Sequence, residues 1–269
     1  MAAQSLQLVA SKDGTRIAYS VSGSGPRLVV VSGAMGHRAL SFARQMTEGL
    51  SQRFTVVDYD RRGRGESGDA QPYAVAREVE DLAAVVAGPG QGDCHVVGLS
   101  SGAALALEAA ASGVPMKGLV AYEPPYMVGS DPTGKPDADY LQKMQALVAA
   151  GKRDEAVSYF MRTVGVPGPM LFVMRLMPFW KDAKAVAHTL PYDGAVMGDF
   201  SLPAARLKKV RAPTVLMNGS KSPRTLQEGT AAAAAAIPGA RHVVLPKQTH
   251  AVKPAALASA LAAAFKDPN

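Results

Sequence analysis

The sequence predicts an α/β protein with a mostly parallel sheet that is interrupted once by a helical insertion. Short β-branched runs alternate with segments of helical periodicity in residues 1–123 and 211–269, a pattern typical of strands covered by helices. Residues 124–210 contain helical pieces and no strand of comparable quality. We therefore expect a core formed by residues 1–123 and 211–269, and a helical lid subdomain formed by residues 124–210.

The chain begins with two predicted strands, Leu6–Ala10 and Arg16–Val21, on either side of Asp13-Gly14. This dipeptide is a strong hairpin signal, so the pair is expected to be antiparallel. Six further strands are predicted at Arg27–Ser32, Phe54–Asp60, Cys94–Leu99, Lys117–Glu123, Pro213–Asn218 and Ala240–Pro246. Helices are predicted between them at Leu40–Leu50, Ala74–Ala87, Ser101–Ser112, Pro223–Ala236 and Pro254–Phe265.

The predicted lid is rich in methionine and contains Phe172, Phe179 and Trp180, with prolines separating its helices. These side chains favour an apolar, adaptable pocket for a hydrophobic acyl or aryl group. Alternatively, they attach the lid to the core.

Composition excludes several classes of protein. The net charge is +7, but basic residues are scattered except in "RRGR" (Arg61–Arg64) and "RLKKVR" (Arg206–Arg211), and no nucleic-acid module accompanies them. We expect these runs to lie on a solvated surface. No leader-like segment or membrane-length apolar run is present, and the single Cys94 fits a buried thiol. The sequence predicts a cytoplasmic protein without membrane insertion or nucleic-acid partner.

The segment Gly98-Leu99-Ser100-Ser101-Gly102 joins a predicted strand to a predicted helix and matches G-x-S-x-G. In this turn the serine is exposed above the sheet edge, and the glycines allow close backbone packing. The pattern indicates that Ser100 is a nucleophile. The alternative is that Ser100 only caps the helix, although a cap does not require both glycines.

A nucleophilic serine needs a base, and His250 follows the last predicted strand. In a parallel sheet that loop opens on the same edge as Ser100, so His250 is the predicted general base. His37 and His188 are expected in a pocket wall or on the surface, and His95 and His242 within strands. Backbone N–H groups of Ala34 and Ser101 are the predicted oxyanion donors.

These motifs resemble those of the α/β-hydrolase fold family over nearly the whole chain. The resemblance lies in "GLSSG", in "SGAMG" after the third strand, in "DRRGRGESG" (Asp60–Gly68), and in His250. It implies sheet order 1-2-4-3-5-6-7-8 with strand two antiparallel. Within Asp60–Gly68, "GRGESG" also fits a dinucleotide fingerprint, but it follows the fourth strand, not the first. We interpret it as a family turn in which Arg62 pairs with Asp60.

The resemblance also identifies a departure, because relatives usually carry the triad acid after strand seven, where this chain has Ser222. Ser222-Pro223 is predicted to be the N-cap and first residue of the next helix. Glu123, at the end of strand six and held extended by Pro124, is the candidate replacement. It could instead be a hinge residue paired with an arginine. Asp193 and Asp199 are further candidates, and a dyad without an acid is the last alternative.

The sequence thus predicts a serine hydrolase that cleaves an ester or lactone of a hydrophobic small molecule through an acyl-enzyme on Ser100. No cofactor or metal is expected, and the protein is predicted to be a monomer or homodimer. The alternatives are a cofactor-free lyase, cyclase or C–C bond-cleaving enzyme, and a non-catalytic ligand-binding module.

Overall fold

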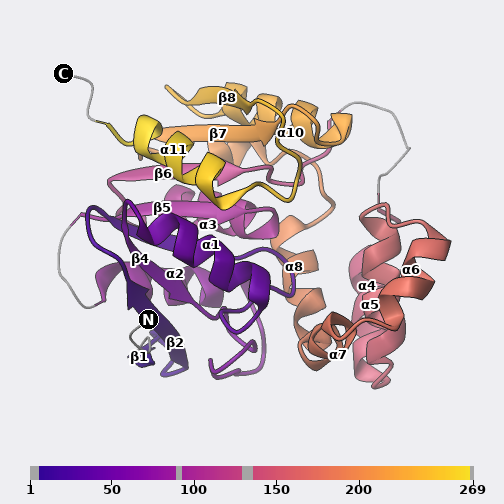
Figure 1. The fold of residues 1–269 in the computed structure, drawn as a ribbon. Helices are drawn as coiled ribbons and strands as arrows, with labels where there is room; N and C mark the ends of the chain where they lie inside the picture. The colour runs from indigo at the N-terminus through magenta and orange to yellow at the C-terminus, as the bar shows by residue number, and fades with distance from the viewer. Residues whose placement is uncertain (1–5, 89–92, 129–135, 267–269) are drawn as a thin grey trace.

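The computed structural model describes residues 6–88, 93–128 and 136–266, and contains one eight-stranded sheet (Figure 1). The strand order is β1-β2-β4-β3-β5-β6-β7-β8, as the resemblance implies. β2 is antiparallel to both neighbours, and the other pairs, from β4 to β8, are parallel. The strands are β1 (Gln7–Ala10), β2 (Arg16–Ser22), β3 (Arg27–Val31), β4 (Thr55–Tyr59), β5 (His95–Leu99), β6 (Gly118–Tyr122), β7 (Thr214–Gly219) and β8 (Arg241–Leu245).

The Asp13-Gly14 turn closes the β1–β2 hairpin as predicted. Gly14 has a φ of 83°, and the Asp13 carboxylate accepts a hydrogen bond from the Thr15 N–H at 2.9 Å. Glycine adopts this left-handed conformation without a steric penalty, so the local sequence defines the register of the first two strands.

Helices cover both faces of the sheet. On one face α1 and α11 pack over a cluster that includes Leu28 and Leu257, and on the other α2, α3 and α10 pack over a cluster rich in alanine. Ala103, Ala106 and Ala109 of α3 are completely buried, which allows this helix to approach the central strands closely. The five core helices are α1 (Ser41–Ser51), α2 (Val75–Ala87), α3 (Ser101–Ala111), α10 (Arg224–Ala236) and α11 (Pro254–Ala264).

The segment between β6 and β7, here the helical insertion, contains the remaining helices. These are α4 (Tyr140–Ala149), α5 (Arg153–Thr163), α6 (Gly168–Arg175), α7 (Phe179–Ala185), η1 (Ala187–Thr189), α8 (Leu190–Met197) and α9 (Ala204–Leu207). Figure 1 shows α4 to α7 standing to one side of the sheet, with α8 between them and the core. Residues 129–135, part of the predicted lid, lie outside the described residues, and the division at 124 and 210 remains a prediction.

The insertion has a small apolar core of its own. Trp180, Met144 and Met161 are buried there among side chains from α4, α5 and α7. The Trp180 indole N–H donates a hydrogen bond to Asp154 at 2.7 Å, which satisfies its polar edge. Trp180 therefore joins the insertion helices to one another.

Candidate active site

Ser100 lies in the sharp turn between β5 and α3, with backbone angles φ 56° and ψ −125°. This conformation is strained for a residue with a side chain. The turn is possible only because of its glycines: a Cβ on Gly98 would lie 2.5 Å from the Ala103 Cα, and one on Gly102 would lie 2.3 Å from the Val31 carbonyl oxygen. Ser100 makes no side-chain cap hydrogen bond to α3, so the capping interpretation is wrong.

His250 and Glu123 form a direct contact across 127 residues of sequence. Nδ1 of His250 lies 2.6 Å from Oε2 of Glu123, whose side chain is fully buried, while the His250 side chain is 43% exposed. One end of the imidazole is thus held inside the protein and the other end is accessible. Of the three predicted acid candidates, Glu123 is the one that contacts His250.

The Glu123 carboxylate has three hydrogen-bond partners. Besides His250, the Gly219 N–H donates to its Oε1 at 2.7 Å, and the Ser222 hydroxyl donates to the same oxygen at 2.5 Å. Burial alone would raise the pKa of Glu123, but the hydrogen bonds from His250, Ser222 and Gly219 outweigh it and lower this pKa below its usual value. The carboxyl group is therefore ionised at neutral pH.

Two local predictions for this region were wrong. Glu123 is not extended: its φ is 48°, and this left-handed bend turns the carboxylate toward the end of β7. Ser222 is not the N-cap of α10, which has no side-chain cap, because the hydroxyl is engaged by Glu123. The position where relatives carry the acid thus supplies a donor to an acid from the neighbouring strand.

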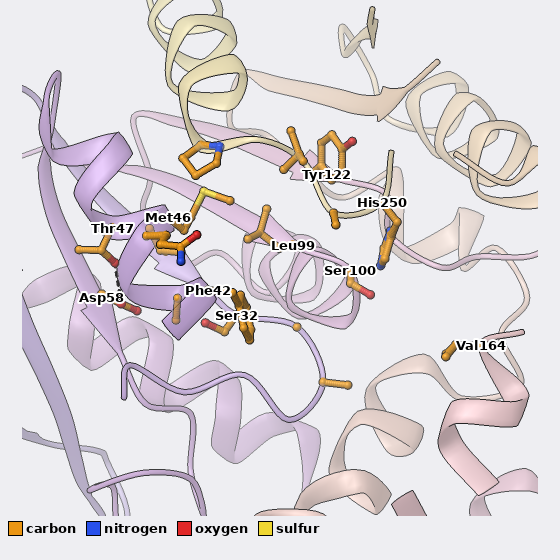
Figure 2. Close-up of a pocket in the computed structure, with 18 of the residues that line it drawn as sticks. Ser32, Phe42, Met46, Thr47, Asp58, Leu99, Ser100, Tyr122, Val164 and His250 are labelled. Carbon is orange, nitrogen blue, oxygen red and sulfur yellow. Dashed lines mark hydrogen bonds between the residues drawn. The ribbon is translucent and has the colours of Figure 1, made fainter. Parts of the chain in front are cut away.

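Ser100 and His250 line the same cavity, which has a volume of about 440 Å³. Figure 2 shows the His250 ring beside the Ser100 side chain, with Tyr122 and Leu99 nearby. The Tyr122 hydroxyl donates a hydrogen bond to the Thr249 carbonyl at 2.6 Å, which fixes the loop that carries His250. The cavity wall is largely apolar, with Phe42 and Met46 from α1 and Phe160 and Val164 from the helical insertion.

Of the two predicted oxyanion donors, Ser101 directly follows Ser100, and Ala34 belongs to the lining of the same cavity. Ala34 lines it, and no described residue accepts a hydrogen bond from the Ala34 N–H. Ser101 is the first residue of α3, where N–H groups have no acceptor within the helix. The Ser101 side chain points elsewhere, since its hydroxyl donates to Asp193 at 2.8 Å. Ser101 therefore has only its backbone to offer an oxyanion.

Asp193, on α8, is a buried ion-pair partner and not a neighbour of His250. Its carboxylate oxygens lie 2.7 Å from Arg61 and 2.7 Å from Arg64. Burial would raise the pKa of Asp193, but the charges of Arg64 and Arg61 outweigh it and lower this pKa. Asp199, the other alternative, is exposed and accepts hydrogen bonds from Ser201.

The run Arg61–Arg64 is buried, which corrects the prediction of a solvated basic patch. Arg62 pairs with Asp81 at 2.8 Å and Asp13 at 2.9 Å, and not with Asp60 as predicted. Asp60 instead accepts the Arg38 and Glu66 N–H groups and so closes its own turn. The second basic run was predicted correctly, because its four basic side chains, Arg206, Lys208, Lys209 and Arg211, are exposed.

The aromatic residues predicted to form the pocket do not line it. Phe172 is 66% exposed on α6, while Phe179 and Trp180 pack within the insertion. The cavity instead takes Phe42 from α1 and Phe160 from α5, together with Thr47 and Asp58. The amphipathic pattern of α1 indicates that one side of this helix faces the protein interior. Only the fold shows that residues of α1 line the cavity.

Two of the other histidines lie within strands as expected, whereas His37 and His188 are half-buried and do not line the cavity that holds Ser100. His95 and His242 are in β5 and β8, His37 follows β3, and His188 lies in η1. His95 stacks on Phe265 with ring centroids 4.0 Å apart, and His242 hydrogen-bonds Asn218 at 2.6 Å. In the described part of the chain, no three His, Cys, Asp or Glu side chains gather into a possible metal site. Among its helices, none has the length and apolarity that crossing a bilayer requires.

This fold and site define an α/β-hydrolase-fold protein with a buried acid after β6. The profile of the alpha/beta hydrolase family matches residues 28–260, and the chain belongs to that family. A crystal structure of an alpha/beta hydrolase from Sphaerobacter thermophilus is 48% identical, with a TM-score of 0.88, and the match covers 97% of this chain and all of that one.

Two further similarities are more distant. "Putative carbamate hydrolase RutD" from Caulobacter segnis is 38% identical over 92 residues, so the match spans 32% of this chain and only 34% of that relative. The esterase RhEst1 from Rhodococcus sp. is 19% identical with a TM-score of 0.68, covering 98% of this chain and all of that one, and it is similar in fold alone.

Proposed function

We propose that the protein is a serine hydrolase that cleaves ester or lactone bonds of a hydrophobic small molecule. The observation that carries this proposal is the 2.6 Å contact between His250 Nδ1 and Glu123 Oε2, in a cavity that Ser100 shares. A buried carboxylate on Nδ1 fixes the ring and its tautomer, so that Nε2 is the proton acceptor. The lowered pKa of Glu123 favours this arrangement, because the acid stays charged when the imidazole becomes protonated.

In the proposed reaction, Nε2 of His250 takes the proton of the Ser100 hydroxyl while Oγ attacks the acyl carbon. The Ala34 and Ser101 N–H groups stabilise the resulting oxyanion. The carbonyl re-forms as the ester bond breaks, and the alcohol leaves with the proton from His250. Water, deprotonated by His250, then attacks the acyl-enzyme, and the acid is released as Ser100 regains its proton.

The substrate class follows from the cavity. Apolar contacts on both sides of Ser100 are provided by Phe42, Met46, Leu99, Phe160 and Val164. The adaptable methionine side chain suits a flexible substrate chain. We therefore propose a neutral alkyl or aryl ester or lactone as the substrate, bound without a membrane or nucleic-acid partner.

A fluorophosphonate probe tests this function. Intact protein should be labelled, and Ser100→Ala and His250→Ala should lose labelling. The matched control is Ser112→Ala at the other end of α3, where the serine is exposed, and it should label like the intact chain. Absence of labelling in the intact protein would exclude an activated Ser100.

A further inference from the structure

A buried carboxyl group in the wall of this cavity has an unused oxygen. Asp58, on β4, is 4% exposed and lines the cavity together with Thr47 of α1. The Thr47 hydroxyl donates to Asp58 Oδ2 at 2.8 Å. The other oxygen, Oδ1, is buried and has no hydrogen-bond partner among the described residues.

This isolation is unusual within the molecule. The other buried acids of the described chain are Asp60, Glu78, Asp81, Glu123 and Asp193, and none has a buried oxygen without a partner. An unsatisfied buried acceptor lowers the stability of the folded state. Because a leucine or valine would fill this strand position without that cost, the carboxyl group is explained better by something that binds it.

The position of Asp58 relative to Ser100 defines what could bind. Figure 2 shows Thr47 and Asp58 at the opposite end of the lining side chains from Ser100 and His250, with Met46, Phe42 and Leu99 between them. A molecule whose carbonyl lies at Ser100 would therefore pass along apolar side chains before it reaches the carboxyl group. Its far end would meet the Asp58 carboxyl group and the Thr47 hydroxyl, in a cavity whose lining also includes Ser32 and Gln45.

We infer that Asp58 and Thr47 form a distal subsite for a hydroxyl group at the end of the substrate remote from the bond that is cleaved. A hydroxyl can donate to Oδ1, and it brings no charge into the cavity. A hydroxyl also costs less to desolvate than an ammonium group, whose loss of hydration in an apolar cavity is large. This inference rests on the proposed function, because it takes Ser100 as the place of the scissile carbonyl.

The electrostatic surroundings agree with a neutral ligand. Burial raises the pKa of Asp58 to about 7; the Thr47 hydrogen bond lowers it, the Asp60 charge raises it further, and Arg38 lowers it. The carboxyl group is thus not held in its charged form by a strong ion pair. Oδ1 accepts a hydrogen bond from a hydroxyl while the group is ionised, and the protonated group can donate one to the same hydroxyl.

The test uses pairs of nitrophenyl esters of increasing chain length, each pair with either a methyl or a hydroxyl group at the end of the acyl chain. A parallel series carries the hydroxyl on the alcohol side. At the matching length, and at a pH above 7 where Asp58 is ionised, we expect the hydroxyl ester to have a kcat/KM about 10- to 100-fold above the methyl ester, the value of a hydrogen bond to a charged group. In Asp58→Leu the preference should reverse, and Thr47→Val should retain most of it.

Equal ratios in the intact protein and Asp58→Leu would overturn the subsite, and would indicate that Asp58 meets only water. A preference for amino-terminated esters that depends on Asp58 would overturn the choice of a neutral ligand. A binding measurement separates this inference from the proposed function. Calorimetry on Ser100→Ala compares the affinities of the methyl esters of the same acids, with a hydroxyl or a methyl group at the end of the acyl chain. A hydroxyl preference in binding without any hydrolysis by the intact protein would refute the hydrolase and keep the subsite.

Discussion

Asp193 and Asp58 are both buried acids, but the two regions that hold them differ in how completely the charge is paired. Asp193 lies where the helical insertion meets the core, and Arg61, Arg64 and the Ser101 hydroxyl all bind it. Asp58 lies in the cavity wall, and Thr47 is its one side-chain hydrogen-bond partner among the residues that the structure describes. The pKa of Asp193 is lowered and that of Asp58 is raised.

The two acids illustrate two uses of a buried carboxyl group. A fully paired carboxylate joins elements distant in sequence, here α8 to the turn after β4. Removing it would leave Arg64 without its carboxylate partner and Arg61 with Glu78 alone. An incompletely paired carboxyl group in a cavity costs stability and has an acceptor left for a ligand. Glu123 combines both situations, because its buried partners hold it while His250 connects it to the cavity.

The largest effect is expected for Glu123→Gln. An amide cannot stabilise the imidazolium, so ester turnover should fall about 10³- to 10⁴-fold while the circular dichroism spectrum stays unchanged. Turnover near that of the intact protein would remove Glu123 from the proposed triad.

The next largest effect is expected on stability, at the ion pairs by which Asp193 connects α8 to the turn after β4. Asp193→Leu leaves Arg61 and Arg64 without their shared carboxylate, and should lower the free energy of unfolding by about 3–5 kcal/mol in urea titrations. Asp199→Asn, on the exposed end of the same segment, is the control and should change it by less than about 0.5 kcal/mol. Similar values for the two variants would show that the buried ion pairs of Asp193 do not stabilise the fold.

The two acids should also give opposite pH dependence. The Asp58 pKa is raised in the folded state, so its contribution to stability is complete below the unfolded pKa and is lost as pH rises through about 7. Between about pH 5 and pH 8, the intact protein should lose about 2–3 kcal/mol more than Asp58→Asn. Asp193 has a lowered pKa, so its contribution is lost on acidification instead. Parallel pH profiles for the intact protein and Asp58→Asn would refute the raised pKa.

The smallest effect is expected for Ser222→Ala. This change removes one of three hydrogen bonds to Glu123, worth about 1 kcal/mol, so kcat should fall about fivefold. The pH profile of kcat/KM distinguishes an effect on the triad from a merely structural one. With one hydrogen bond fewer, Glu123 should be positioned less firmly against His250, and the apparent pKa of the base should fall. Ser222→Asp cannot serve as the control, since it would place a second carboxylate beside Glu123.

The sequence by itself predicted those features that depend on neighbours along the chain. β-branched runs and helical periodicity located the strands and helices, and glycine spacing located the Ser100 turn. The position of Glu123 at the end of a parallel strand was enough to make it a candidate acid. Each of these inferences uses local pattern or the fixed geometry of a parallel sheet edge.

Only the tertiary structure decided which polar groups meet. Ser222 and Glu123 are 99 residues apart, and Arg61 and Asp193 are 132 apart, so no local pattern distinguishes a buried pair from a solvated charge. No local pattern identifies Asp58 either. Its unpartnered oxygen can be recognised only in the folded chain, where residues of α1 and of the His250 loop line the same cavity. The physical reason is that a charge is paired or left free by packing across the whole chain, whereas strands, helices and turns form from adjacent residues.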